Sequence, residues 1–304
     1  MKKLVLNLSI FILPVVVIIS MIQIDKRLNY LGLKDDCANH GIWIHDRVNS
    51  NNKKIDIAFI GSSHTINGIN DKLISERLKT KEAVNFGYCR FGRNLSYVLL
   101  KEIYERKKIK QLVLEVTENE DQYSHPVFPF IASSKDVIFP NPFFNRDIIA
   151  DIWSHFAFKV EMLQETWYNK IPNTPINTSD FGMLNATDTA SVTLLNATKS
   201  LENNKSKLEQ DFRANFARVY LKKISDFCKE NNIQLTFLYI PSYANRLAKP
   251  IEYQTYSKYG NILIPPNRIL NKQANWFDEN HLNLTGANEL SIWVSDQIDK
   301  KVSN

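Results

Sequence analysis

The sequence is poor in the residues from which compact metal and redox sites are built. It has 3 cysteines in 304 residues, Cys37, Cys89 and Cys228, and no two of them form a Cys-x-x-C pair. A zinc site or a thioredoxin-like site therefore has no support, and we expect no cofactor. One disulfide with a thiol left over would suit a compartment outside the cytoplasm, whereas three buried free thiols would suit any compartment. The cysteines leave these alternatives open.

A dense basic run is also absent, although the net charge is +6 and the isoelectric point is near 9.0. The lysines are scattered among asparagine and isoleucine residues, so nucleic acid is not an expected partner. Hydrophobic residues make up 44% of the chain and charged residues 23%, which is typical of a globular protein. No internal repeat is visible, and the length suits one large domain or two smaller ones.

Long apolar runs are absent except at the N-terminus. Residues 4–24 carry no charge, and about 20 such residues suffice for a helix that crosses the hydrocarbon core of a bilayer. A cleaved signal peptide usually has a shorter apolar region of about 7–15 residues, so we interpret residues 1–24 as a retained transmembrane anchor. Lys2 and Lys3 favour a cytoplasmic N-terminus. The sequence thus predicts a single-pass protein of the bacterial cytoplasmic membrane, with its body on the outer face.

After the anchor we expect a polar neck over residues 25–54 and one α/β domain over residues 55–304. Apolar segments alternate there with amphipathic ones, which is typical of a parallel sheet covered by helices on both faces. The expected strands are residues 56–60, 82–86, 109–116, 233–241 and 261–264. The expected helices are residues 71–78, 95–108, 205–231 and 285–300.

An insertion at about residues 121–204 interrupts this alternation. Its first half is rich in aromatic residues, and its second half is rich in threonine, asparagine and serine. Insertions of this length are usually either functional or disordered. Two interpretations fit the composition. The segment forms a small satellite core, or it forms a lid or docking surface for a sugar or lipid beside the site described next.

Two polar segments far apart in the chain carry the candidate chemistry. "DIAFIGSSHTING" places Ser62, Ser63 and His64 directly after a buried strand, at the sheet edge where α/β proteins bind ligands. "DENHLN" places Asp278 three residues before His281. A serine hydroxyl needs a base to act as a nucleophile, and a carboxylate can hold a histidine base in the right tautomer. Each segment alone also suits a plain turn or a helix cap.

Together the two segments resemble the first and last signature blocks of the SGNH (GDSL-like) hydrolase superfamily. "VNFGYCRFG" looks like the second block, with Gly87 at its glycine, and "LVLEVTENE" looks like the third, with Asn119 at its asparagine. The four blocks occur in the family's order. The resemblance implies a flavodoxin-like three-layer α/β/α sandwich, with Ser63 and Asn119 at the C-terminal edge of adjacent strands.

The resemblance also implies a catalytic triad, in which Ser63 is the nucleophile, His281 the base and Asp278 the partner that orients the base. The oxyanion of the tetrahedral intermediate would accept hydrogen bonds from the backbone N–H groups of Ser63 and Gly87 and from the side-chain amide of Asn119. Removing one such donor typically slows catalysis by about 10²–10³-fold.

Two positions depart from the family pattern. Ser62 replaces an aspartate, and Thr117 replaces a glycine of the third block. The missing aspartate is neither nucleophile nor base in the family, so the triad is still expected, whereas Thr117 weakens the assignment of Asn119. We interpret His64 as a structural or pocket-lining residue, because strand alternation turns it away from its neighbour Ser63.

The Gly-Ser-Ser block, the N-terminal helix and the insertion are similar to the membrane-anchored cell-envelope acyl-transfer proteins, such as those of teichoic-acid D-alanylation and alginate O-acetylation. These proteins commonly work beside a multi-spanning membrane O-acyltransferase. The resemblance therefore implies a serine esterase or O-acyltransferase that acts on O-acyl groups of a cell-envelope glycan through an acyl-serine. The alternative is a non-enzymatic, membrane-tethered docking subunit of a polymer-modification complex, because fold does not fix function.

Overall fold

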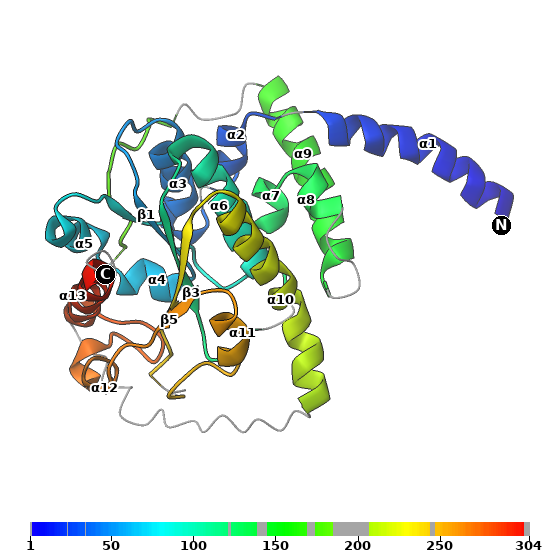
Figure 1. Cartoon of the computed structure of the whole chain (residues 1–304). Helices are drawn as coiled ribbons and strands as arrows, with labels where there is room; N and C mark the ends of the chain where they lie inside the picture. Colours follow the sequence, from blue (N-terminus) through cyan, green and yellow to red (C-terminus); the bar gives the residue numbers. More distant parts are fainter. Residues whose placement is uncertain are drawn as a thin grey trace.

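The computed structural model describes residues 2–22, 24–33, 35–120, 123–138, 145–168, 174–184, 207–243 and 247–300. Within them lies a five-stranded sheet in the order β2-β1-β3-β4-β5, in which each strand is parallel to its neighbours (Figure 1). The strands are β1 (Ile57–Ile60), β2 (Ala83–Asn85), β3 (Gln111–Val116), β4 (Gln234–Tyr239) and β5 (Asn261–Leu263). Each one falls inside a segment that the apolar pattern predicts as a strand.

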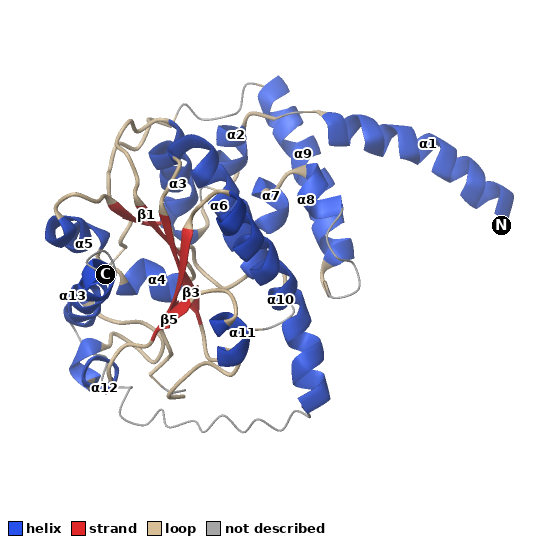
Figure 2. Cartoon of the chain, in the orientation of Figure 1, coloured by secondary structure: helices blue, strands red, loops and turns tan. Residues whose placement is uncertain are grey.

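Helices surround the sheet (Figure 2). The segment before β1 forms α1 (Lys2–Met21), α2 (Lys26–Leu31), the 3-10 turn η1 (Cys37–Asn39) and α3 (His40–Asn49). Between β1 and β3 lie α4 (Ser63–Gly68), α5 (Asp71–Leu78) and α6 (Arg93–Lys107). The insertion contributes α7 (Phe128–Ile131), α8 (Ser134–Ile138) and α9 (Ile148–Trp167). The remaining helices are α10 (Lys207–Glu230), α11 (Tyr253–Ser257), α12 (Asn267–Leu270), η3 (Gln273–Asn275) and α13 (Leu284–Lys300).

The two faces of the sheet bury separate hydrophobic cores. Strand β1 sends Ala58 and Ile60 into a core shared with α3, α6, α7 and α10. Its alternate side chains, Ile57 and Phe59, enter a second core shared with α5, α12 and α13. Successive side chains of a strand point to opposite faces, so β1 is apolar throughout because both of its faces are covered. The architecture is α/β, consistent with three layers.

The segment expected as a neck packs against the body. Tyr30 of α2 and Ile44 of α3 are buried in the first core, and the Tyr30 hydroxyl donates a hydrogen bond to Glu102 Oε2 of α6 (3.1 Å). In the sequence, polar residues separate the apolar residues of α2 and α3. For this reason the pattern predicts a polar neck. Residues 25–54 therefore contribute to the first core, in addition to linking α1 to the sheet.

The described helices of the insertion extend the first core and pack against α2 and α6, so they do not form a separate satellite core. Phe128 of α7 is 1% exposed, and Phe158 of α9 packs against Gly32 at the end of α2. Among the described insertion residues, Tyr123 lines the cavity beside Ser63, and α7–α9 lie at the other side of the molecule (Figure 1). These helices do not form a lid.

The polar second half of the insertion begins at residue 173, and its described part, residues 174–184, packs on the body: Gly182 N donates to Asp71 Oδ2 (2.7 Å) and Trp43 Nε1 donates to the Ser179 carbonyl oxygen (3.0 Å). Residues 185–204 lie outside the described residues.

The N-terminal apolar run forms α1, which leaves the body and extends away from it (Figure 1). Within the described part of the chain, no helix is both long enough and apolar enough to cross a membrane.

Candidate active site

The site begins at a tight turn after β1. Ile60 ends the strand and α4 starts at Ser63, so only Gly61 and Ser62 connect them. A Cβ on Gly61 would lie 2.1 Å from Thr65 Oγ1 and 2.3 Å from Glu115 Oε2. No larger residue fits this close approach. The turn therefore places the first residue of α4 at the carboxyl edge of the sheet, where open α/β folds bind ligands.

A buried carboxylate on the neighbouring strand holds this turn. Glu115 of β3 accepts hydrogen bonds from Ser62 N (2.7 Å), Ser62 Oγ (2.7 Å) and Thr65 N (3.0 Å), and from the Thr65 hydroxyl. Its side chain is fully buried. A buried charge is tolerated only when hydrogen bonds satisfy it, and four donors of the turn do so here. The N–H and hydroxyl of Ser62 are therefore both hydrogen-bonded to Glu115, and Ser63 is the serine that faces outward.

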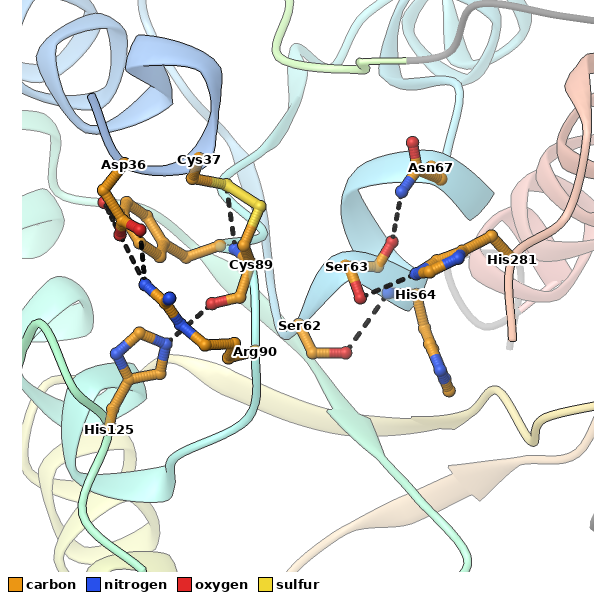
Figure 3. The surroundings of a disulfide bond; sticks show 11 residues. Asp36, Cys37, Ser62, Ser63, His64, Asn67, Cys89, Arg90, His125 and His281 are labelled. Carbon is orange, nitrogen blue, oxygen red and sulfur yellow. Dashed lines mark hydrogen bonds and ion pairs between the residues drawn. A yellow bond between two sulfur atoms is a disulfide. The ribbon is translucent and has the colours of Figure 1, made fainter. Parts of the chain in front are cut away.

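Ser63, His281 and Asp278 form one hydrogen-bonded chain. His281 Nε2 lies 2.9 Å from Ser63 Oγ, and His281 Nδ1 lies 3.0 and 2.9 Å from the two carboxylate oxygens of Asp278. Figure 3 shows His281 reaching Ser63 from the opposite side of the site. Because a carboxylate only accepts, Nδ1 carries a proton and the neutral ring leaves Nε2 free to accept the serine proton.

The Asp278 carboxylate is held in its ionised form. Burial acts to raise the pKa of Asp278, but hydrogen bonds from the His281 ring and from the backbone N–H groups of Asn280 and His281 outweigh it and lower the pKa below its ordinary value. Asp278 Oδ1 accepts from the backbone N–H groups of Asn280 (2.7 Å) and His281 (2.8 Å). The loop thus curls around Asp278, which explains why a three-residue spacing suffices to join the two side chains.

A cavity of about 360 Å³ opens at Ser63. Asn119 lines it, and its side chain is exposed there. Arg90, Phe91 and Tyr123 also line it. The cavity is large enough for a small acyl group and part of an acceptor molecule. The expected Asn119 therefore lies in the same cavity as Ser63.

Glu118 and His64 also line this cavity. Burial raises the pKa of Glu118, and its Oε1 accepts a hydrogen bond from Ser242 N (2.5 Å). His64 Nδ1 lies 3.0 Å from the carbonyl oxygen of Ile240. Its ring meets the edge of the His281 ring with centroids 5.8 Å apart. His64 lines the pocket and anchors α4 to the segment after β4, as expected for a structural residue.

Gly87 lies next to the turn without facing the cavity. Its N–H donates to Asn85 Oδ1 (3.0 Å), while the Asn85 amide donates to the carbonyl oxygens of Thr65 and Ile69 (both 2.8 Å). A Cβ on Gly87 would lie 2.7 Å from Ile66 N. The Asn85 side chain therefore holds α4 in place through these hydrogen bonds. The Gly87 N–H, which was expected to bind the oxyanion, donates to Asn85 in this structure.

A disulfide lies beside the site. Cys37 and Cys89 are bonded, and their Cα atoms are 5.5 Å apart, whereas Cys228 is a buried free thiol. The bond ties the turn before α3 to the loop after β2, which carries Arg90 into the cavity wall (Figure 3). The sequence left this pairing open, because the two cysteines stand 52 residues apart with nothing local to join them.

Sequence reasoning missed Glu115, although a signal was present. "IKQLVLEV" carries one acidic residue within an apolar strand, and a charge in a strand buried on both faces requires partners. The described residues contain no group of three or more histidine, cysteine, aspartate or glutamate side chains arranged to hold a metal ion.

No protein-family model, no curated protein and no solved structure matches this chain.

Proposed function

We propose that the chain is a membrane-anchored serine esterase or O-acyltransferase of the SGNH type, acting outside the cytoplasm on O-acyl groups of a cell-envelope glycan. The carrying observation is the hydrogen-bonded chain from Ser63 through His281 to Asp278. The strand order agrees with a flavodoxin-like sheet. The Cys37–Cys89 disulfide agrees with an oxidising compartment. A multi-spanning acyltransferase would be a natural partner.

The reaction begins when Ser63 Oγ bonds to the acyl carbon and passes its proton to His281 Nε2. The oxyanion that forms accepts hydrogen bonds from the Ser63 N–H and the Asn119 amide, since the Gly87 N–H is engaged with Asn85. The bond to the leaving oxygen then breaks, and that oxygen takes the proton from Nε2. Asp278 holds the ring and stabilises its positive charge during the transfer.

In the second half, a glycan hydroxyl or water gives its proton to His281 Nε2 and attacks the acyl-serine. The bond between the acyl carbon and Ser63 Oγ breaks, and Oγ recovers the proton. Transfer and hydrolysis differ only in the identity of this second nucleophile. A sugar hydroxyl as the acceptor gives O-acyl transfer.

Labelling by a fluorophosphonate, followed by peptide mapping, tests the proposal on the full chain. We expect a covalent label on Ser63 of the wild type, and none on the Ser63→Ala variant. A label on Ser62 would overturn the assignment of the nucleophile. No label on the folded protein, with no turnover of O-acylated glycans, would favour the non-enzymatic docking subunit instead.

A further inference from the structure

Helix α9 presents an apolar stripe to the outside of the molecule. At 100° per residue, six of its side chains fall on one face within about 40° of the mean direction: Ile149, Trp153, Phe156, Val160, Leu163 and Trp167. Ile149 is 82%, Trp153 75% and Trp167 84% exposed. The opposite face, with Phe158 and Met162, is buried against the body. Both faces of α9 are therefore apolar, but the outward face leaves these three large side chains exposed, with Phe156, Val160 and Leu163 half-buried.

The exposed stripe of α9 is continuous with the exposed surface of α1. The two helices are in contact, and Lys159 Nζ of α9 donates a hydrogen bond to the carbonyl oxygen of Ile22, just after α1 (3.1 Å). Large apolar side chains of α1 are also exposed, including Phe11 (77%) and Met21 (76%). Soluble proteins rarely expose a contiguous apolar surface of this extent without a binding partner for it.

The directions of the two helices suit a bilayer. In Figure 1, α1 leaves the body beside α9 and runs away from it, across the direction of α9. A bilayer entered by α1 would therefore lie along α9. Trp153 and Trp167 stand toward the two ends of the stripe. Their indole rings combine an apolar body with an N–H donor, and this combination concentrates tryptophan at the boundary between lipid headgroups and acyl chains.

We propose that the outward face of α9 lies in the interfacial layer of the bilayer that α1 enters, so that the protein is held by two helices in a fixed orientation. This placement rests on the membrane anchoring in the proposed function and adds to it a second contact. The occupant is lipid, because the stripe carries no charge and continues the surface of α1. In Figure 1, α4 and α13, next to the catalytic loop, lie on the side away from α9. The contact would therefore turn the Ser63 cavity away from the membrane surface.

Tryptophan quenching in vesicles tests this placement on the full chain. The protein is reconstituted into phosphatidylethanolamine–phosphatidylglycerol vesicles, with and without brominated acyl chains, and its fluorescence is compared. We expect the brominated lipid to quench the wild type, and the Trp153→Phe/Trp167→Phe double variant to lose at least half of that quenching. Of the three remaining tryptophans, Trp43 and Trp276 are buried, and Trp293 of α13 is half-buried against the second core. All three should give an unquenched background.

A matched control uses an exposed aromatic residue elsewhere. Phe212 on α10 is 53% exposed, so Phe212→Trp, introduced into the double variant, should restore fluorescence without restoring quenching. Equal quenching in the wild type and the double variant would overturn the placement of α9. So would the absence of quenching in vesicles that carry the protein, an outcome that points to a protein partner for the stripe.

Flotation of the same vesicles separates this inference from the proposed function. Protein that floats without quenching contradicts the α9 contact and leaves the anchor intact. Protein that does not float contradicts both the anchor and the contact. Fluorophosphonate labelling of Ser63 in the same sample reports on the catalytic proposal independently of either result.

Discussion

At the scale of single residues, two adjacent serines have different environments because a carboxylate from the next strand engages only one of them. Ser62 gives both its N–H and its hydroxyl to Glu115, and its oxygen accepts the N–H of His64 (3.2 Å). Ser63 starts α4 and faces His281. Ser62 is buried and its hydroxyl points to Glu115, whereas the histidine base reaches the Ser63 hydroxyl. The hydrogen-bond pattern therefore selects Ser63 as the nucleophile.

The triad makes a graded prediction. Ser63→Ala and His281→Ala should each slow acylation by about 10⁴-fold or more, since the nucleophile or its base is gone. Asp278→Ala should be milder, because the imidazole is still present but adopts the productive tautomer less often. Ser62→Ala should retain most activity. Rates of p-nitrophenyl acetate hydrolysis and of fluorophosphonate labelling would measure these effects, and a Ser62→Ala variant as inactive as Ser63→Ala would contradict the assignment.

Glu115 gives a second prediction at this scale. Glu115→Gln keeps the size of the side chain but replaces one accepting oxygen with a donor. Oε1 accepts one of the four hydrogen bonds and Oε2 accepts three, so at least one of them loses its acceptor. We expect the labelling rate of Ser63 to fall by about 10–100-fold, which corresponds to the roughly 1–3 kcal/mol of an unsatisfied buried group. Circular dichroism should show a folded protein. An unchanged labelling rate would mean that the turn keeps its geometry without the carboxylate.

At the scale of elements, the loop after β2 depends on a neutral histidine. His125 Nδ1 accepts the N–H of Val127 (3.1 Å), and its Nε2 donates to the carbonyl oxygen of Cys89 (2.8 Å). A protonated ring could not accept at Nδ1. Burial is the largest cause that lowers the pKa of His125, to about 4. His125 therefore links the disulfide loop to α7 only while it is uncharged.

This histidine predicts a loss of stability in acid. The unfolded chain binds a proton at His125 near its ordinary pKa of about 6.5, whereas the folded chain binds it only near 4. As the pH falls between these values, the unfolded state gains protons first, so the contribution of His125 drops by about 2 kcal/mol by pH 5. Urea unfolding at pH 7.5, 6 and 5 would measure it. His125→Gln should show a shallower decline, and an identical decline would contradict this assignment.

The Cys37–Cys89 disulfide should also contribute to the free energy of unfolding. A crosslink restricts the unfolded chain, and a native bond typically contributes about 2–4 kcal/mol. Dithiothreitol should therefore lower the unfolding free energy of the wild type by that amount. The Cys37→Ser/Cys89→Ser variant should start lower and be insensitive to the reductant. Cys228→Ala serves as the control, since burial raises the pKa of the Cys228 thiol to about 12 and should keep it unreactive. A wild type that is insensitive to dithiothreitol, with complete reduction shown by mass spectrometry, would contradict a stabilising role.

At the scale of the whole molecule, the strands were predictable because each is an apolar run bounded by polar residues. The meeting of Ser63 with His281 was implied by the resemblance of their two segments to the first and last signature blocks of the SGNH superfamily. The pairing of Cys37 with Cys89, and the contact of Glu115 with the turn, depend on tertiary approach that no local pattern encodes. The same holds for the burial of Tyr30 and Trp43 in a segment that reads as a polar neck. Their partners lie on α6 and directly after β2, far along the chain.

The insertion belongs to the same cooperative unit as the sheet, which leads to a prediction about the whole chain. Phe128 on α7 is 1% exposed, and its ring meets the edge of the Tyr220 ring of α10. Phe128→Ala should lower the unfolding free energy by about 3–5 kcal/mol, in one transition that fluorescence and circular dichroism report alike. Phe212→Ala, at an exposed position on α10, should change it by less than about 0.5 kcal/mol. Because Phe128 does not line the cavity, the labelling rate of folded Phe128→Ala should equal that of the wild type. A separate early unfolding transition would show that α7–α9 unfold independently of the sheet. A lower labelling rate of Ser63 in the folded variant would show that these helices affect the site.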